Sequence, residues 1–272
     1  MPKTSPYRLL ALDLDGTLIR HDLVIAPPLK AALAAVRQQG IQVVVASGRM
    51  HRSAAMLARE LGLNGPLISY QGAMTRDIDT DETYYHNPIP RDLANQVVAE
   101  AVRRNYHIHI YANDEIYTAV MDAESLDYGR LNRHDPLAVG DLIEFMVREN
   151  INPTKALIVT DPDSTTRLLG ELQAEFGDRL YITRSYATFT DAVNISSSKG
   201  AALSTLAHRL NIPREQVMAI GDNLNDVPML EWAGFGAAVA NASESAKAAA
   251  DYVASGEVWE GVVEVLEKFV LI

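Results

Sequence analysis

The sequence of 272 residues contains no cysteine. This absence excludes disulfide bonds, a thiolate nucleophile and a zinc site with cysteine ligands. Basic residues are also few, since 24 lysines and arginines stand against 35 aspartates and glutamates and give a formal charge of -11 at pH 7. A surface that binds nucleic acid or an anionic membrane needs clustered lysine and arginine, so the charge argues against both partners. A local positive pocket for one small anion is still compatible with it.

Long apolar runs are missing as well. No stretch approaches the length of a membrane span, and the opening residues, MPKTSPYR, contain no apolar signal region. We therefore expect a soluble, cytoplasmic protein without a membrane or nucleic-acid partner. The glycine-rich dinucleotide fingerprint and the P-loop are absent too, which argues against an NAD enzyme and an NTPase. No pattern indicates an oligomeric state.

The residues that are present predict an ordinary globular α/β protein. Apolar residues make up 48% of the chain and charged residues 22%, and the length suffices for two domains. Short apolar runs typical of buried strands occupy residues 9–14, 41–46, 67–70 and 217–220. Patterns with helical periodicity occupy residues 27–39, 51–61, 200–210 and 258–270. This alternation predicts a Rossmann-like parallel sheet covered by helices on both faces.

The middle of the chain, from residue 83 to residue 190, has a different pattern. Alternating strand patterns such as YHIHIYANDEIYTAV and RLYITRSYATFTDAV are joined by short polar segments, and at least two helix patterns lie among them. Strand pairs with short polar connections are typically antiparallel. We predict an α/β domain at 83–190 that is inserted into a core formed by residues 1–82 and 191–272.

Polar residues follow three of the predicted strands, in the stretches LALDLDGT, VVVASGR and MAIGDNLND. In an open parallel sheet, ligands bind at the carboxyl ends of strands, where loops and helix N-termini converge. Strand ends that are far apart in the sequence are therefore expected to meet around one site. The side chains expected there are Asp13, Asp15, Ser47, Asp222 and Asp226.

So many carboxylates in one place repel one another unless a cation neutralises them. Oxygen ligands without cysteine or paired histidines favour a hard cation, so we expect Mg²⁺ in preference to Zn²⁺. Lys199 follows a run of serines at the start of a predicted helix, where serine is a common capping residue. A helix N-terminus, glycine-flanked amides, one lysine and Mg²⁺ together form a phosphate site. Each signal alone is common as a solvated turn or a surface lysine, but their joint occurrence in this order favours a functional site.

This ordered set of motifs resembles that of the haloacid dehalogenase-like phosphohydrolases, in particular the Cof-type branch with a large α/β cap. DLDGT matches the family's first motif, the serine of ASGR the second, Lys199 of SSSKG the third and GDNLNDVPML the fourth. The resemblance extends over essentially the whole chain and implies that the inserted domain is a cap that selects the substrate. Two positions depart from the pattern. Ser47 stands where threonine is frequent and keeps the hydroxyl, whereas Gln71 stands where asparagine is frequent and is a candidate determinant of substrate preference.

The resemblance also implies a role for each acid of the first motif. Asp13 would attack phosphorus and form an aspartyl-phosphate, and Asp15 would protonate the leaving oxygen and then deprotonate the hydrolytic water. The implied Mg²⁺ ligands are the Asp13 side chain, the Asp15 main-chain carbonyl and Asp222. The implied phosphate ligands are the amides of Leu14 and Gly48 and the side chains of Ser47, Lys199 and Asn225. Asp226 is interpreted as orienting Lys199 or a metal-bound water, with direct metal ligation as the alternative, and Arg49 as a structural ion-pair partner.

The expected substrate is a small phosphorylated metabolite, with sugar phosphates favoured. A sugar-phosphate mutase that uses the same intermediate and a phosphatase of phosphorylated cofactors such as FMN or pyridoxal phosphate are the alternatives. The chain length and Asp15 argue against a phosphotransfer receiver domain, and the presence of every catalytic position argues against a non-catalytic relative. His107 and His109 share one face of a predicted strand with Tyr111, either as metal ligands or as the outer face of a sheet.

Overall fold

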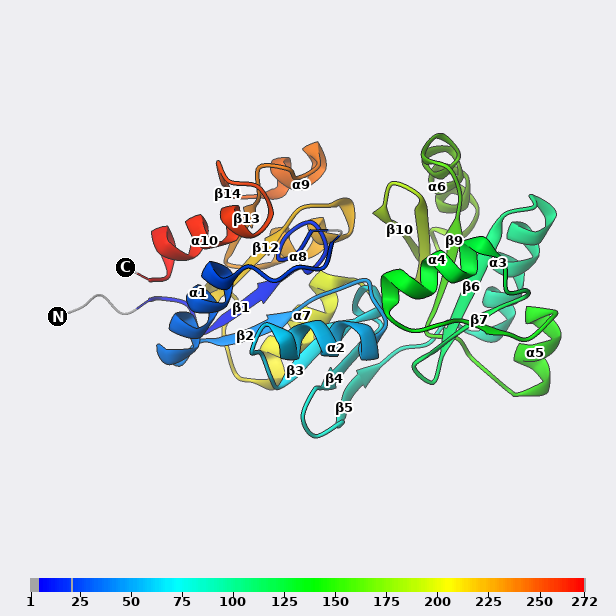
Figure 1. Cartoon of the computed structure of the whole chain (residues 1–272), viewed down its shortest axis with the longest axis horizontal. Coiled ribbons are helices and arrows are strands. Elements are labelled where there is room, and N and C mark those ends of the chain that lie inside the picture. Colours follow the sequence, from blue (N-terminus) through cyan, green and yellow to red (C-terminus); the bar gives the residue numbers. More distant parts are fainter. Residues whose placement is uncertain (1–4, 21, 272) are drawn as a thin grey trace.

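The computed structural model describes residues 5–20 and 22–271, which form two lobes (Figure 1). One lobe, called the core below, contains a five-stranded parallel sheet in the order β14-β13-β12-β1-β2. Its strands are β1 (Leu9–Leu12), β2 (Gln42–Val45), β12 (Val217–Gly221), β13 (Phe235–Ala238) and β14 (Tyr252–Val253). The predicted Rossmann-like parallel sheet is thereby confirmed.

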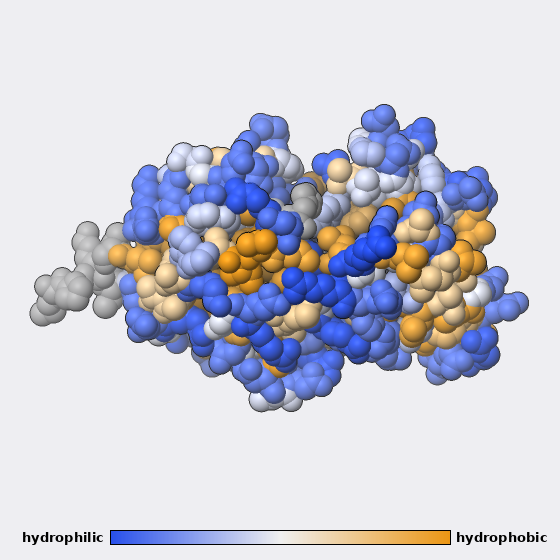
Figure 2. Space-filling view, in the orientation of Figure 1, coloured by the Kyte–Doolittle hydropathy of each residue, from blue (hydrophilic) through white to orange (hydrophobic). Residues whose placement is uncertain are grey.

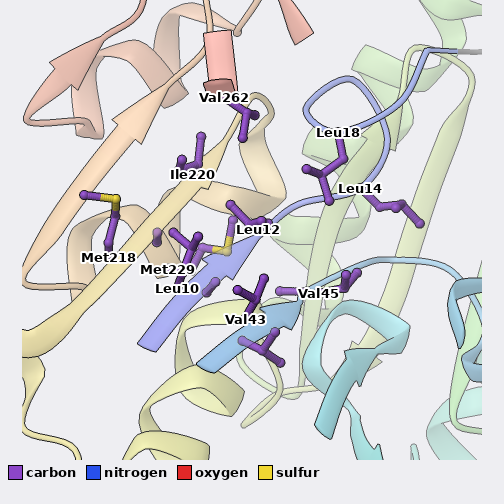
Figure 3. Packing of buried hydrophobic residues seen from close by; sticks show 14 of the residues in the cluster. Leu10, Leu12, Leu14, Leu18, Val43, Val45, Met218, Ile220, Met229 and Val262 are labelled. Carbon is purple, nitrogen blue, oxygen red and sulfur yellow. The ribbon is translucent and has the colours of Figure 1, made fainter. Parts of the chain in front are cut away.

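Helices cover this sheet, and β1 and β12 are therefore buried along their whole length. The core helices are α1 (Pro27–Gln38), α2 (His51–Glu60), α7 (Lys199–Arg209), α8 (Val227–Trp232), α9 (Glu244–Ala249) and α10 (Val258–Phe269). Helix α1 packs against α10, and α7 packs against α8. Figure 3 shows Leu10 and Leu12 of β1 among Val43 of β2, Ile220 of β12 and Val262 of α10, all of which belong to one apolar cluster.

The predicted strand at 67–70 leaves the parallel sheet. Among the described residues, β3 (Pro66–Ser69) is joined to it by a single parallel bridge between Ala46 and Ile68. It then pairs antiparallel with β4 (Met74–Asp77), which pairs in turn with β5 (Thr83–His86). The chain reverses at the 3₁₀ turn η1 (Tyr70–Gly72), where Tyr70 and Gln71 have φ of 52° and 59°. Left-handed backbone at two residues other than glycine has no sequence signature, so the apolar run predicts the strand but not its partners.

The second lobe, called the cap, contains a six-stranded sheet in the order β10-β11-β9-β6-β7-β8, antiparallel except for β7 with β8. Its strands are β6 (His107–Ala112), β7 (Glu115–Thr118), β8 (Leu137–Ala138), β9 (Lys155–Val159), β10 (Leu180–Tyr186) and β11 (Phe189–Asn194). Its helices are α3 (Arg91–Arg103), α4 (Ala123–Asn132), α5 (Leu142–Arg148) and α6 (Pro162–Phe176). The predicted domain boundaries at 82/83 and 190/191 stay a prediction. Strand β5, which begins at residue 83, pairs with β4 before the first boundary, and β11 runs across the second.

Alternate residues of the cap strands face two different apolar clusters. Ile110 of β6 packs in one cluster with residues of α3, α5 and α6. Its neighbour Tyr111 packs in another with Tyr128 of α4 and with Met50 of the core. The face of the cap sheet that carries Tyr111 is therefore turned towards the core. His109 lies on this face and is fully buried, so it does not belong to a solvated outer face.

The surface of both lobes is mostly hydrophilic on the face that Figure 2 shows, with apolar side chains in scattered patches. Among the described residues, no helix combines the length and the apolar character that a membrane crossing requires. The features that bear on function lie instead at the junction of the two lobes, where the ends of the parallel strands meet the cap.

Candidate active site

The carboxyl ends of three parallel strands lie side by side. Leu12, the last residue of β1, is in register with Val45 of β2 and with Ile220 of β12. The polar residues that follow are Asp13 and Asp15 after β1, Ser47 and Gly48 after β2, and Asp222 after β12. The topology therefore brings three of the predicted motifs to one edge of the sheet, as expected for a parallel sheet.

Lys199 reaches this edge as the first residue of α7. The Ser198 hydroxyl caps the helix by accepting the Ala201 N–H at 3.1 Å. The ammonium of Lys199 donates to Asp13 Oδ1 and, at 2.6 Å, to Asp226 Oδ1. Burial alone would lower the pKa of Lys199, but the charges of Asp13 and Asp226 outweigh it, and the pKa is raised. The lysine is therefore a fixed, buried cation next to the first acid of the site.

Asp226 holds both the lysine and the turn after β12. Its Oδ2 accepts the backbone N–H groups of Asp222 at 3.0 Å and Asn223 at 2.9 Å, while its Oδ1 accepts from Lys199. Gly221 permits this close approach, because a Cβ there would lie 2.6 Å from the Cβ of Asp226. These contacts support the interpretation of Asp226 as the residue that orients Lys199.

An acidic cluster fits a divalent cation. Carboxylate oxygens of Asp13, Asp222 and Asp226 lie within 4.8 Å of one another. Burial, and then the negative charge of Asp226, raise the pKa of Asp13 well above its usual range and that of Asp222 to about 7. Gly16, at φ 88°, leaves room for Asp222, since a Cβ there would lie 2.5 Å from Oδ2; Thr17 donates to Oδ1 at 2.7 Å. Two buried carboxylates and one partly buried carboxylate, all with oxygen ligand atoms that repel one another, suit a hard divalent cation.

Asp15 is held by Arg49 through two parallel N–H···O bonds of 2.7 Å each. Arg49 also donates from Nη1 to the Leu131 carbonyl of α4 at 2.6 Å, so its guanidinium links the acid to the cap. Burial lowers the pKa of Arg49 but the charge of Asp15 raises it, and the net shift is upward. Burial, followed by the charge of Asp15, also raises the pKa of the cap residue Tyr186. Arg49 is thus the ion-pair partner that the sequence predicts.

The predicted phosphate ligands differ in whether they line a cavity at this edge of the sheet. Gly48 and Asn225 line a cavity together with Asp13. The other three are fully buried and absent from the lining: Leu14, Ser47 and Lys199. Asn225 is oriented by Gln71, whose Oε1 accepts from its Nδ2 at 2.9 Å. The residue that departs from the family pattern therefore contacts a predicted phosphate ligand.

The cavity has a volume of about 30 Å³ and lies between the core and the cap. Its core side consists of Asp13, Asp15, Gly48, Arg49, Asn223 and Asn225. Its cap side consists of Tyr128, Leu131, Asn132, Lys155, Leu157, Ser185, Tyr186 and Phe189. No motif predicts the cap side, because its residues come from α4, β9, β10 and β11, which are far apart in the sequence. A lysine at the start of an apolar run and aromatic residues at strand ends are the only signals.

The two histidines of β6 lie outside this site. The Nε2 atoms of His107 and His109 are 3.2 Å apart, and Nδ1 of His107 is 3.2 Å from a carboxylate oxygen of Asp122. Burial, and then the charge of His107, lower the pKa of His109 to about 3, so this imidazole is neutral at physiological pH. Contacts within hydrogen-bond distance link His109 through His107 to Asp122, while Nδ1 of His109 has no partner among the described residues.

The chain is similar to known proteins over almost its whole length. The model of the haloacid dehalogenase-like hydrolase family matches residues 10–266. Phosphatase YwpJ of Bacillus subtilis is 31% identical over 282 residues, which cover 96% of this chain and 99% of that protein. YitU of the same organism, named 5-amino-6-(5-phospho-D-ribitylamino)uracil phosphatase, is 29% identical and covers 98% of each chain. The crystal structure of a haloacid dehalogenase-like hydrolase from Bacteroides thetaiotaomicron has a TM-score of 0.82 at 31% identity, covering 96% of this chain and 99% of that one.

Proposed function

This chain belongs to the haloacid dehalogenase-like hydrolases as a phosphatase of the Cof type, and we propose that it releases phosphate from small phosphorylated metabolites, with sugar phosphates preferred. The observation that supports this most is the position of Asp13. It is a buried carboxylate in contact with Lys199, at the core side of a cavity that cap residues close. A carboxylate placed there can reach a small group such as a phosphoryl group, while the rest of the substrate has to lie against the cap.

The proposed reaction has two steps that use both acids of the first motif. An oxygen of Asp13 bonds to phosphorus while the bond from phosphorus to the leaving oxygen breaks, and Asp15 gives that oxygen its proton. Asp15, now ionised, takes a proton from water, and the water oxygen attacks phosphorus to release phosphate and the Asp13 carboxylate. Arg49 donates to both oxygens of Asp15 at 2.7 Å, so its guanidinium fixes the position of this carboxyl group.

Positive charge is needed where the phosphoryl group binds, because a carboxylate and an anionic phosphoryl group repel each other. Lys199 supplies one fixed cation. The proposed ligands of the phosphoryl oxygens are the side chains of Ser47, Lys199 and Asn225 and the amides of Leu14 and Gly48. Mg²⁺, held by the Asp13 side chain, the Asp15 main-chain carbonyl and Asp222, would supply the remaining positive charge when bound.

The cap side of the cavity favours a second substrate class. Tyr128, Tyr186 and Phe189 form an aromatic wall, with ring centroids of Phe189 5.4 Å from Tyr128 and 5.2 Å from Tyr186. Such a wall suits packing against a heteroaromatic ring. The relative YitU is named for a phosphorylated ribityl compound that carries a uracil ring. Phosphorylated cofactors and their precursors are therefore the second candidate class.

A screen of phosphorylated metabolites for release of inorganic phosphate tests the proposal. We expect release from sugar phosphates with the highest kcat/KM; a higher value for ring-bearing phosphates would favour the second class. A mutase would instead accumulate an isomer of the substrate without free phosphate. Absence of phosphate release from every member of the screen would contradict the proposal.

Activity is expected to require a divalent cation. The acids at Asp13 and Asp222 leave an uncompensated negative site, which repels the phosphoryl group until a cation binds. Phosphate release should therefore stop after exhaustive chelation and return when Mg²⁺ is added, with Mn²⁺ or Co²⁺ as possible substitutes. The measurement is the rate with p-nitrophenyl phosphate before chelation, after it and after addition of each metal. Full turnover in the chelated protein would rule out this requirement.

Binding of Mg²⁺ is expected to become tighter as the pH rises through neutrality. The pKa of Asp222 is raised to about 7 in the metal-free protein, and a ligand carboxylate has to lose its proton to bind a cation. Because this folded-state pKa lies above the unfolded value of about 3.9, the stability that Asp222 contributes to the metal-free chain falls as pH rises between the two values. Mg²⁺ should therefore raise the Tm more at pH 8 than at pH 5.5. Equal shifts at both pH values would contradict this reasoning.

A further inference from the structure

A set of buried polar groups, called the ring below, joins Lys155 and Asp191 of the cap to Gly48, Gln71 and Asn225 of the core beside the cavity. Nζ of Lys155 donates to the Gly48 carbonyl at 2.8 Å and lies 2.9 Å from Oδ1 of Asp191. Oδ2 of Asp191 accepts from Nε2 of Gln71 at 3.2 Å, and Oε1 of Gln71 accepts from Nδ2 of Asn225 at 2.9 Å. Lys155 and Asp191 belong to cap strands and the other three residues to the core. The four side chains of the ring are no more than 5% exposed.

The charge of Asp191 dictates how both amides of the ring are oriented. An ionised carboxylate only accepts hydrogen bonds, so Gln71 has to turn its NH₂ group towards Asp191 and its oxygen towards Asn225. Asn225 must then present its own NH₂ group. One of its two N–H bonds is donated to Gln71, and the second is left for a group in the cavity, which Asn225 lines. The orientation of this donor therefore depends on a residue of the cap.

Gln71 is held in place by an unusual backbone conformation. Its φ of 59° lies in the left-handed region, which residues other than glycine rarely adopt. Its carboxamide packs so closely on Gly48 that a Cβ at that glycine would lie 2.4 Å from Nε2. The same side chain therefore fixes two proposed phosphate ligands, Gly48 by contact and Asn225 by a hydrogen bond.

Lys155 makes the ring depend on the position of the cap. A buried ammonium needs compensation, which Asp191 and the face of the Tyr111 ring, 4.6 Å from Nζ, provide within the cap. The bond from Lys155 to the Gly48 carbonyl and the bond from Gln71 to Asp191 cross to the core. These two bonds exist only while the cap lies against the core.

We propose that Lys155, Asp191 and Gln71 are positioning residues that orient Gly48 and Asn225 for phosphate when the cap is closed; this inference rests on the proposed phosphatase function. Closure then raises the affinity for the phosphoryl group at the moment at which the cavity is shielded from water. Lys155 and Gln71 contact proposed ligands of the phosphate, and Asp191 contacts those two residues. They are therefore expected to act on binding more than on the chemical step.

The first test is Gln71→Asn in the full chain. Asparagine tolerates the left-handed backbone better than glutamine, so the substitution adds no backbone strain, but its shorter side chain cannot span from Asp191 to Asn225. Loss of one net hydrogen bond predicts that the dissociation constant of inorganic phosphate, measured by calorimetry, rises about threefold to tenfold. KM for p-nitrophenyl phosphate should rise by a similar factor, whereas kcat should change less than twofold.

The second test is a double-mutant cycle between the core and the cap. The paired substitution Lys155→Met with Asp191→Asn removes both buried charges together, so that no lone ion is left in the cap. It should weaken phosphate binding by a factor similar to that of Gln71→Asn. The triple variant should bind phosphate no more weakly than Gln71→Asn or the paired variant, because all three changes break the same ring. Thr190→Val is the matched control, since this buried cap residue adjoins Asp191 but its hydroxyl has no hydrogen-bond partner among the described residues.

These measurements separate this inference from the proposed function. Absence of phosphate release by the wild-type protein would overturn the phosphatase proposal, while calorimetry with inorganic phosphate would still test the ring. Phosphate affinity within twofold of wild type in Gln71→Asn would overturn the proposed role of the ring. So would losses of affinity from the core and cap substitutions that multiply in the triple variant. An equal loss of affinity in Thr190→Val would do the same, because it would show a general sensitivity of the cap. If Gln71→Asn does not fold, the paired cap substitution decides alone: unchanged affinity in that folded variant overturns the proposal.

Discussion

Replacing Asp13 by asparagine is expected to lower kcat by roughly four orders of magnitude or more with every substrate, because an amide cannot form the acyl phosphate. No phosphate should become attached to the protein, whatever the leaving group, and mass spectrometry of the quenched reaction should show the unmodified chain. Inorganic phosphate should still bind, because Lys199 and Asn225 remain in place.

The same substitution should leave the fold at least as stable at pH 8. Burial, and then the negative charge of Asp226, raise the pKa of Asp13 in the metal-free protein. A group with a raised folded-state pKa loses stability as pH rises through the window between its unfolded and folded values, so the ionised carboxylate is unfavourable at pH 8. Asparagine carries no charge, and its Oδ1 can still accept from Lys199. Thermal unfolding of the metal-free variant at pH 8 should therefore give a Tm equal to or above that of the wild type.

Asp77→Asn is the matched control in the core. Burial raises the pKa of Asp77, but hydrogen bonds from the backbone of Thr80 and Asp79 and from the Tyr84 hydroxyl outweigh it, and the pKa is lowered. This carboxylate stabilises the fold above its unfolded pKa, and that stability is lost as pH falls. Asp77→Asn should therefore lower the free energy of unfolding at pH 8 by about 1 kcal/mol and leave kcat unchanged. The opposite pattern would be a loss of stability in Asp13→Asn without one in Asp77→Asn. It would show that the loss of activity in Asp13→Asn reflects unfolding.

The core of the site could be predicted because each of its residues is tied to a local signal. Asp13 and Asp15 follow an apolar run, and Lys199 follows a serine that caps a helix. Bringing these segments together needs only parallel pairing of β1, β2 and β12, which aligns their carboxyl ends. That alignment is a general property of a parallel sheet, so it requires no knowledge of side-chain packing.

Contacts that cross from the cap to the core could not be predicted. Lys155 has the pattern of an ordinary lysine at the start of an apolar strand, yet its ammonium reaches the Gly48 carbonyl. Arg49 adjoins a motif, but its bond to the Leu131 carbonyl depends on how α4 lies over the core. Both contacts require the register of the cap sheet and the position of the cap, and neither is encoded in a local pattern. Gln71 departs from the family pattern, but its partners become clear only from the structure.

Asp15→Asn is expected to separate the two steps of the reaction according to the leaving group. With an alkyl phosphate, kcat should fall by roughly 10² to 10⁴, because the alkoxide would have to leave without a proton. With p-nitrophenyl phosphate the leaving group needs little protonation, so Asp13 can still be phosphorylated. Breakdown then lacks its base, and the phosphorylated protein should accumulate.

Rapid-quench mass spectrometry tests this separation directly. The Asp15→Asn variant should show added phosphate on the peptide that contains Asp13, together with a burst of nitrophenol that does not exceed the amount of enzyme. The variant leaves Arg49 without its carboxylate, and breaking a buried ion pair can cost about 3–5 kcal/mol of stability. Asp15→Asn combined with Arg49→Met removes the unpaired cation as well. It should therefore recover stability and still give the burst, if Asp15 acts as the proton carrier.

Three outcomes would contradict the assigned roles. The first is a phosphate label on Ser47 in the Asp15→Asn variant. The second is a label that persists when Asp13→Asn is added, which would place the nucleophile elsewhere. A burst of equal size with alkyl and nitrophenyl phosphates would also show that leaving-group protonation does not depend on Asp15. The proton would then have to come from another group near the cavity, and Tyr186 beside Asp15 would be the next residue to replace, by phenylalanine.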